Sequence, residues 1–372
     1  MSTSATLKRT PLFDQHVALG ARMVEFGGWE MPVQYSGIVD EHNAVRGAAG
    51  LFDISHMGEF EVKGPDALAF LQHVCTQDIA AIGEGMANYS LLCRPDGGIV
   101  DDIFVYNLPD GYLVVVNASN IDKDFAWMLD NLHGFNVELT NISDHASMLA
   151  LQGPAAEGIL AQAAGPELAA LPFHGVATGM LLGDIPGIVA RTGYTGEDGF
   201  ELFIDDDNAA RLWDGLLALG RAAGLKPAGL GARDSLRFEA CLPLYGHEIA
   251  DDINPYEAKL GWAVKLDKGS DFVGRATLAQ IKQQGVARKL AGFELTERGI
   301  ARGGYELRDA AGVRIGEVST GMPAPSLGKN LGLGLVPAAL ATEGSELSVV
   351  VRDRPVRARV VKTPFYKPRY KK

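Results

Sequence analysis

The sequence has few of the features that mark several large classes of protein. Its 372 residues include only three cysteines, Cys75, Cys93 and Cys241, which are widely spaced and odd in number. They form neither a disulfide framework nor a metal-ligand spacing. No apolar run approaches the ~20 residues that a membrane-spanning helix needs, and Met1–Pro11 lacks an apolar signal-peptide core. We therefore expect a soluble, cytoplasmic protein with no membrane partner.

Basic residues are also fewer than acidic ones. Lys and Arg number 34 against 46 Asp and Glu, which gives a formal net charge of −12. A general nucleic-acid binder would present a basic face, so we expect no nucleic-acid partner. Basic residues gather only in the C-terminal segment from Arg352, where an exposed strand face such as Arg357 and Arg359 accounts for them most simply.

Motifs of several enzyme classes are missing as well. The eight histidines never pair at metal-ligand spacing, so we predict no metal, and we interpret His56 as a structurally satisfied histidine. Gly229-Leu230-Gly231 lacks the third glycine of a dinucleotide fingerprint. No Gly-x-Ser-x-Gly elbow is present, which argues against a serine hydrolase of that fold.

Glycine, in contrast, is abundant: 45 of 372 residues, or about 12%, against an average of ~7%. Together with few long helical periods, this predicts many turns and a β-rich chain. The length exceeds one ordinary core, so two or three domains are expected. After a boundary near Asp267–Arg275, short strands separated by turns predict a small β-barrel or sandwich: Leu290–Leu295, Gly304–Arg308, Arg314–Ser319, Leu331–Val336 and Ser348–Val361.

One stretch combines a turn, a strand and two acids. Pro95–Gly98 is a turn signal, and Ile99–Tyr106 is an apolar, β-branched run that predicts a strand. Since side chains alternate along a strand, two faces are expected, Ile99, Asp101, Ile103 and Val105 on one, and Val100, Asp102, Phe104 and Tyr106 on the other. Farther on, Ser119, with Asp122 three residues later, predicts a helix N-cap.

A carboxylate among large apolar groups must be paired, hydrogen-bonded or raised in pKa. Two interpretations of Asp101 and Asp102 stay open at this point. At least one of them has a chemical role, or both satisfy backbone groups near the turn, as Asp often does.

Further polar groups lie in apolar or glycine-rich surroundings: Asp101, Asn117, Tyr194, Glu201 and Arg233. Tyrosines, carboxylates and an arginine suit a flat, polar aromatic ligand that needs edge hydrogen bonds and apolar faces more than a metal. A pterin, a flavin or a purine would fit this description equally.

Several long motifs, in order, resemble the aminomethyltransferase (T protein) family of the glycine cleavage system over nearly the whole chain. They are Leu51-Phe52-Asp53-Ile54-Ser55-His56-Met57, Gly97-Gly98-Ile99-Val100-Asp101-Asp102, Arg191-Thr192-Gly193-Tyr194-Thr195-Gly196-Glu197 with Glu201, and Gly231-Ala232-Arg233-Asp234-Ser235-Leu236-Arg237. The resemblance implies an α+β fold with a three-domain, cloverleaf-like arrangement and a C-terminal β-barrel or jelly-roll-like domain. The implied limits are 1–50 plus 140–266 for a discontinuous first domain, 51–139 for the second and 267–372 for the third.

The resemblance also supplies a reaction. The family takes an aminomethyl group from the lipoyl arm of a partner, the H protein, releases ammonia and forms 5,10-methylenetetrahydrofolate with tetrahydrofolate as co-substrate. Its essential aspartate corresponds to Asp101. Its folate-pocket residues correspond to Met57, Tyr89, Asn117, Tyr194, Glu201 and Arg233, and a C-terminal tyrosine corresponds to Tyr370. The basic C-terminal segment then becomes a candidate docking surface for an acidic carrier protein.

The resemblance leaves two other functions open, which related proteins of this fold are expected to have. One is a demethylase that transfers methyl groups from small sulfonium or N-methyl compounds to folate. The other is a folate-binding accessory protein of iron–sulfur cluster maintenance, for which a Lys-Gly-Cys-Tyr-x-Gly-Gln-Glu motif is expected. The corresponding loop, Arg191–Asp198, has no cysteine, and the retained Asp101 favours catalysis.

Overall fold

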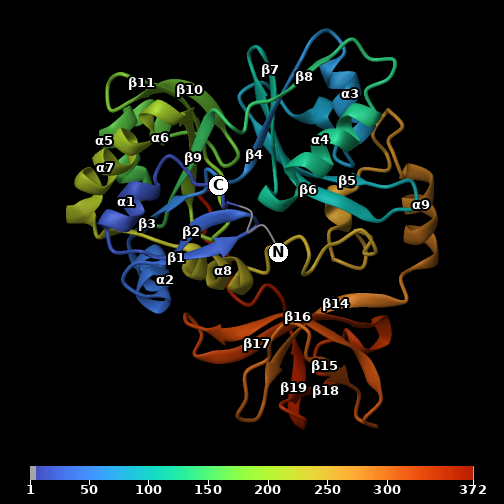
Figure 1. Ribbon diagram of the computed structural model, residues 1–372. Coiled ribbons are helices and arrows are strands. Elements are labelled where there is room, and N and C mark those ends of the chain that lie inside the picture. Colours follow the sequence, from blue (N-terminus) through green and yellow to red (C-terminus); the bar gives the residue numbers. More distant parts are fainter. Residues whose placement is uncertain (1–5, 372) are drawn as a thin grey trace.

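The computed structural model describes residues 6–371. Figure 1 shows two assemblies of strands and helices side by side, with a barrel of strands below them. This mixed architecture with a C-terminal barrel confirms the predicted α+β fold class.

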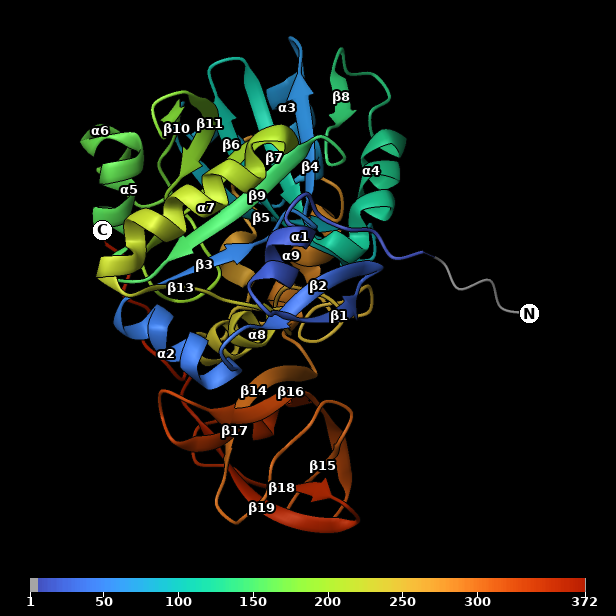
Figure 2. The same ribbon diagram turned by 60° about the vertical axis from the view of Figure 1, so that its left-hand side comes forward.

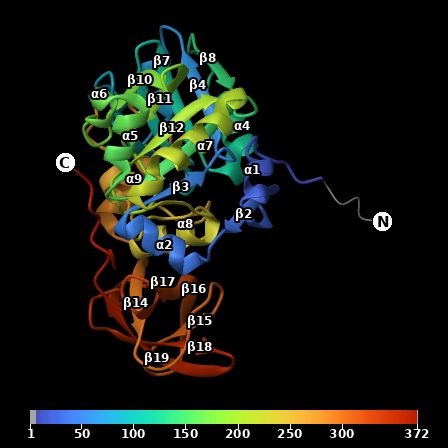
Figure 3. The same cartoon turned by 90° about the vertical axis from the view of Figure 1, so that its left-hand side faces the viewer.

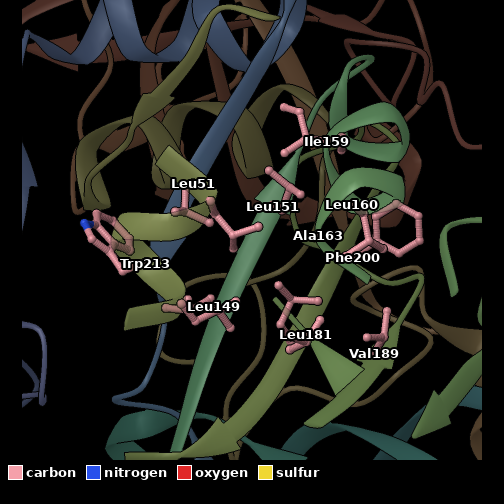
Figure 4. Close-up of a cluster of buried hydrophobic side chains, with 14 of the residues drawn as sticks. Leu51, Leu149, Leu151, Ile159, Leu160, Ala163, Leu181, Val189, Phe200 and Trp213 are labelled. Atoms are coloured by element: carbon pink, nitrogen blue, oxygen red, sulfur yellow. The ribbon is translucent and has the colours of Figure 1, made fainter. Parts of the chain in front are cut away.

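The first assembly is built on a six-stranded sheet in the order β10-β11-β12-β9-β3-β13, in which only β3 and β13 run parallel. Its strands are β3 (Ala49–Asp53), β9 (Ala146–Gln152), β10 (Val176–Leu181), β11 (Ile185–Ala190), β12 (Gly199–Asp205) and β13 (Leu225–Pro227). Helices α5 (Ala156–Ala164) and α7 (Ala209–Gly220) pack against it. Figure 4 shows Ile159 and Leu160 of α5 and Trp213 of α7 against strand residues such as Leu149. The apolar residues of α7 recur at helical spacing, which is why one face of this helix is buried.

Further helices and strands border this sheet. They are helices α1 (Phe13–Ala18), α2 (Ile38–Gly47), α6 (Pro166–Ala169) and α8 (Leu230–Glu239), and the antiparallel strands β1 (Arg22–Phe26) and β2 (Trp29–Gln34).

The second assembly is an antiparallel sheet of five strands in the order β5-β6-β7-β4-β8. The strands are β4 (Gly58–Lys63), β5 (Ala87–Cys93), β6 (Ile99–Leu108), β7 (Gly111–Val116) and β8 (Glu138–Asn141). Helices α3 (Ala67–Val74) and α4 (Ile121–Asp130) contribute to the buried cluster on one of its faces.

The two sheets also share a core. One buried cluster joins Phe52 and Met148 of the first sheet to Tyr106 and Leu113 of the second. At this seam between the sheets, the ring of Tyr106 of β6 meets that of Phe203 of β12 edge-on, with centres 5.3 Å apart. The seam thus brings together residues that are far apart in the sequence.

The C-terminal part is a closed barrel in the order β14-β17-β16-β15-β18-β19, preceded by α9 (Arg275–Gln284). Its strands are β14 (Arg288–Leu295), β15 (Glu306–Arg308), β16 (Arg314–Ala324), β17 (Lys329–Pro337), β18 (Glu346–Val351) and β19 (Arg354–Val361). The final segment leaves the barrel and returns along the first assembly, ending near α5 and α6 (Figures 2 and 3). The backbone N–H of Arg369 donates to the Gly196 carbonyl at 2.8 Å, and Lys371 Nζ donates to Glu157 of α5 at 2.7 Å.

One local prediction is wrong. The single strand expected over 348–361 is a hairpin, because Arg352 and Asp353 turn the chain with φ of 49° and 64°.

The domain limits stay a proposal. Strand β3 crosses the limit at 50/51 and pairs with β9 and β13 of the first sheet. Strand β8 likewise crosses the limit at 139/140 and pairs with β4 of the second sheet. Between residues 6 and 371, no helix has both the length and the apolar character to span a membrane.

Candidate functional site

Asp101 lies in β6 and is fully buried. Its Oδ1 accepts hydrogen bonds from Asn117 Nδ2 and from Asn120 Nδ2, both at 2.8 Å, and its Oδ2 accepts from the backbone N–H of Asn117 at 3.1 Å. No ion pair joins Asp101 to a Lys, Arg or His among the described residues. The carboxylate is thus held by amide dipoles rather than by a cation.

A short turn between β7 and α4 supplies these amides. Residues Ala118–Asn120 form a 3₁₀ turn, and α4 begins at Ile121 with Asn120 as its N-cap residue. The predicted N-cap at Ser119 is therefore wrong, because the chain makes this extra turn before the helix starts and no side chain caps it. The turn has a different use here, since it brings Asn117 and Asn120 to the same carboxylate.

A β-bulge changes the predicted faces of β6. Asp101 pairs with Leu92 and Ile99 with Cys93, so Val100 is the extra residue. Ile99 consequently packs in the cluster that contains Cys93, whereas Val100 and Ile103 pack in the cluster under α3 and α4. The alternation holds from Asp101 onward and fails before it, so the prediction that Ile99 and Asp101 share a face is wrong.

Asp102 accepts hydrogen bonds from two side chains. Its Oδ2 accepts from the Tyr89 hydroxyl at 3.1 Å, and its Oδ1 accepts from Asn117 Nδ2 at 2.7 Å. Burial, reinforced by the neighbouring charge of Asp101, raises the pKa of Asp102 to about 7. The Asn117 N–H is the one backbone donor to the two acids among the described residues, and their other donors are side chains. The two acids therefore do more than accept hydrogen bonds from backbone groups near the turn.

Tyr194 and Arg233 form a second part of the site. The Arg233 guanidinium lies 4.6 Å from the centre of the Tyr194 ring, and the Tyr194 hydroxyl donates to the Pro243 carbonyl. Arg233 forms no ion pair within residues 6–371 and is half-buried, and burial lowers its pKa. Tyr194 sits in a tight loop in which Gly196 has a φ of 77° and a Cβ there would come within 2.8 Å of Ala240.

Glu201 of β12 faces the seam between the sheets. Its Oε2 accepts from Thr192 Oγ1 at 2.5 Å and from the hydroxyl of Tyr106, on β6, at 3.1 Å. Burial raises the pKa of Glu201. Both contacts involve the same oxygen, so Oε1 receives no hydrogen bond from the described residues.

The other two predicted residues lie in apolar surroundings. Met57, in the turn between β3 and β4, packs against the cluster shared by the two sheets. Tyr370 stacks on Phe173 with ring centres 4.8 Å apart, and Phe173 stacks on His174 at 3.9 Å. His174 in turn meets Phe104 of β6 edge-on at 5.1 Å, so Tyr370 ends a row of aromatic rings that reaches the second sheet.

The structure thus brings part of the predicted set into contact. Asp101 and Tyr89 are connected through Asn117 and Asp102, and Tyr194 contacts Arg233. No direct contact joins Asp101 to Glu201, Met57 or Tyr370 among the described residues. Sequence reasoning missed Asn120, whose spacing from Asn117 was the available signal, and it missed the aromatic neighbours Phe173, His174 and Trp262. Trp262 is exposed and stacks on Tyr89 at 5.3 Å.

The structure does not fully support the interpretation of His56 as a structurally satisfied histidine. Its Nδ1 is buried and has no hydrogen-bond partner among the described residues, so the histidine is not fully satisfied. Burial, aided by the charge of Arg233, lowers its pKa to about 4. Over residues 6–371, no group of three or more His, Cys, Asp or Glu side chains is arranged to hold a metal ion.

Comparison with known proteins identifies the family of the chain. Residues 12–268 match the family described as GCVT N-terminal domain, and residues 288–367 match the glycine cleavage T-protein C-terminal barrel domain. The chain is 55% identical over 367 residues to an aminomethyltransferase of Herpetosiphon aurantiacus, covering 98% of this chain and 100% of that protein. It is 53% identical over 364 residues to one of Moorella thermoacetica, covering 98% and 99%.

A solved structure is similar as well. The crystal structure of glycine cleavage system aminomethyltransferase T from Bartonella henselae superposes with a TM-score of 0.90 at 35% identity, covering 98% of this chain and 100% of that one. The two family matches together, and the alignment with a full-length relative, extend across the two sheet assemblies and the barrel. The chain belongs to the aminomethyltransferase family of glycine cleavage T proteins.

Proposed function

We propose that the chain takes an aminomethyl group from the lipoyl arm of H protein, releases ammonia and passes the carbon to tetrahydrofolate as 5,10-methylenetetrahydrofolate. The observation that carries this proposal is Asp101, a fully buried carboxylate that three amide N–H groups hold without a cation. Such a group is suited to a reaction in which positive charge develops beside it.

The first requirement of the reaction is charge stabilisation. When the C–N bond of the aminomethyl group breaks, the bonding electrons leave with nitrogen, and positive charge develops on the carbon that remains bound to sulfur. A carboxylate that is already desolvated and oriented stabilises this charge without further reorganisation. Asp101 meets both conditions, because it has no exposed surface and its two oxygens are fixed by the Asn117 and Asn120 amides.

The second requirement is a proton acceptor. Two nitrogens of tetrahydrofolate form bonds to the carbon as its bonds to the departing ammonia and to the lipoyl sulfur break. Each of these nitrogens loses a proton, and the two protons are balanced by the one that the ammonia gains and the one that the released lipoyl thiol gains. We assign acceptance of one of these protons to Asp101 as general base. Asp102 is hydrogen-bonded through Asn117 to the same site, and its pKa of about 7 suits a neighbour that exchanges protons near neutral pH.

The chain's residues suit a folate. Tyr89 and Tyr194 offer aromatic faces, and Asn117, Met57 and Tyr370 contribute polar and apolar walls. Glu201 Oε1 is free of hydrogen bonds from the described residues and suits an N–H edge of the pterin. Arg233, which has no carboxylate partner within residues 6–371, suits the carboxylate of the glutamyl group.

The proposal includes the setting of the enzyme. The lipoyl group comes from the partner, and no metal takes part in the chemistry assigned above. We place the reaction in the cytoplasm, and the basic C-terminal segment is the proposed docking surface for the carrier.

A transfer assay tests the proposal. The purified chain would be mixed with tetrahydrofolate and aminomethyl-loaded lipoyl carrier, and ammonia and methylenetetrahydrofolate would be followed together. We expect both products in equal amounts. Folate binding without transfer would contradict the proposal and favour the demethylase or the accessory protein, which sulfonium or N-methyl donors would then separate.

A further inference from the structure

A second carboxyl group lies against Asp101 and has no part in the chemistry proposed above. Asp124, in the first turn of α4, is fully buried. Neither of its oxygens has a hydrogen-bond partner among the described residues. An ionised carboxylate buried in this way would be very costly.

Asp124 lies four residues after Asn120, on the same face of α4, and Asn120 Nδ2 donates to Asp101 at 2.8 Å. The carboxyl of Asp124 is therefore directed at the part of β6 that carries Asp101, and Asp101 raises the pKa of Asp124. Two carboxyl groups can share a hydrogen bond only when one of them carries a proton. The three amide N–H groups on Asp101 favour its charged form, and Asp124 has no such donors. The proton therefore belongs on Asp124.

The other charges around Asp124 do not alter this assignment. Lys123 Nζ is 3.9 Å from Asp124 Oδ1, beyond hydrogen-bond distance, and donates instead to the Val100 carbonyl at 2.5 Å. Asp102 of β6 and Tyr245, in the loop after α8, are the remaining titratable neighbours, and the negative charge of Asp102 also favours a neutral Asp124. Burial first, and then Asp101, raise the pKa of Asp124 to about 11.

We propose that Asp124 is a positioning residue that stays protonated and donates its O–H to Asp101, so that the pair carries a single negative charge, located on Asp101. This inference rests on the proposed role of Asp101 in the transfer reaction. It predicts that the group at position 124 must be a hydrogen-bond donor and must not carry a charge.

The pH profile of transfer tests both conditions with two variants. Asp124→Asn keeps a donor without a charge, so its acid limb should coincide with that of the unmodified chain. Asp124→Ala removes the donor, so the acid limb should move up by about one pH unit while the plateau rate is largely retained. If the acid limb of Asp124→Asn moved to lower pH, the substitution would have removed a charge, and the proposal would be overturned. An acid limb that does not move in Asp124→Ala would also overturn the proposal.

Infrared spectroscopy tests the protonation itself, whether or not the chain performs the proposed transfer. The difference spectrum between the unmodified chain and Asp124→Asn at pH 7.5 should contain the C=O stretch of a protonated carboxylic acid. Bands of an ionised carboxylate in its place would overturn the proposal. This measurement also remains decisive where Asp124→Ala does not fold, and a positive band with no transfer would count against the proposed function alone.

Glu59 provides a matched control. It is another fully buried carboxyl, on β4 of the sheet that carries Asp101, and neither of its oxygens has a partner among the described residues. Burial raises its pKa well above the ordinary value, but Asp101 is not among its neighbours. Glu59→Gln should therefore remove a protonated-acid band and leave the pH profile unchanged. A profile shift as large as that of Asp124→Ala would mean that any buried acid has this effect, and would overturn the specific role of Asp124.

Discussion

Asp53 and Asp101 are both buried aspartates, but their surroundings compensate the charge in different ways. Asp53, at the end of β3, accepts hydrogen bonds from His16 Nε2 at 2.9 Å, Thr10 Oγ1 at 2.6 Å and the Ser55 N–H at 2.9 Å. His16 is itself enclosed, since its other nitrogen bonds to the Tyr35 hydroxyl at 2.9 Å and its ring meets Trp213 edge-on. Asp101 has amide donors and a buried acid but no basic partner among the described residues.

The difference separates a structural acid from one available for chemistry. Burial alone would raise the pKa of Asp53, but the hydrogen bond and charge of His16, with Thr10 and Ser55, hold it below its ordinary value. Its charge is already balanced within the fold. Amide dipoles hold Asp101 in place without cancelling its charge, so that charge remains available to a developing cation.

The largest expected effect on stability belongs to the Asp53 region. Asp53→Asn breaks a buried pair and leaves His16 without its charged partner, so the free energy of unfolding should fall by about 3 kcal/mol. Denaturant unfolding measures this change. Because Asp53 is not in the proposed chemistry, the transfer rate per folded molecule should stay unchanged. A large loss of rate would contradict the purely structural role of Asp53.

Asn120→Ala tests the role of the amide donors around Asp101. It removes one amide donor from Asp101, and we expect the transfer rate to fall about 10- to 100-fold, as for a lost hydrogen bond to a charged group. Asn131→Ala is the matched control, since Asn131 follows the other end of α4 and its amide bonds only to the Trp127 carbonyl among the described residues. Equal losses in both variants would indicate damage to the helix rather than to the site.

Asp102→Asn tests the coupling between the two acids of β6. The pKa of Asp102 rises from 3.8 to about 7 on folding, so the folded chain binds this proton more tightly than the unfolded chain. The stability due to the neutral form is full below the unfolded value and is lost as the pH rises through 7. Between pH 5 and 8 the unmodified chain should lose about 2 kcal/mol more unfolding free energy than Asp102→Asn. Denaturation curves at the two pH values measure this, and parallel losses would contradict it.

The smallest effect is expected on the barrel. Charge reversal at Arg357 and Arg359 should raise the KM for the carrier a few-fold and leave folate binding unchanged, because rim charges act mainly on encounter. The effect is limited because Arg357 already pairs with Glu297 at 2.7 Å and Arg359 lies 3.9 Å from Glu346. Arg314→Glu, on another barrel strand, is the control. Equal changes for carrier and folate would count against the docking surface.

The sequence was most informative where local patterns decide the structure. The turn before β6, the strand itself and the short strands of the C-terminal barrel followed from residue type and period. The bulge at Val100 and the 3₁₀ turn before α4 were not predicted, because they depend on partner strands and on the side chains that hold Asp101. Asp124 gave no signal in the sequence either, since an Asp in the first turn of a helix is usually an exposed residue that favours the helix dipole.

The central claim is that Asp101 carries the transfer, and Asp101→Asn tests it most directly when rate and folate affinity are measured on the same preparation. The substitution keeps the shape of the side chain and removes its charge. We predict that tetrahydrofolate binding changes little, whereas the release of ammonia from the loaded carrier slows by at least about 100-fold, as for other losses of preorganised charge stabilisation. Near-normal transfer by Asp101→Asn would contradict the account.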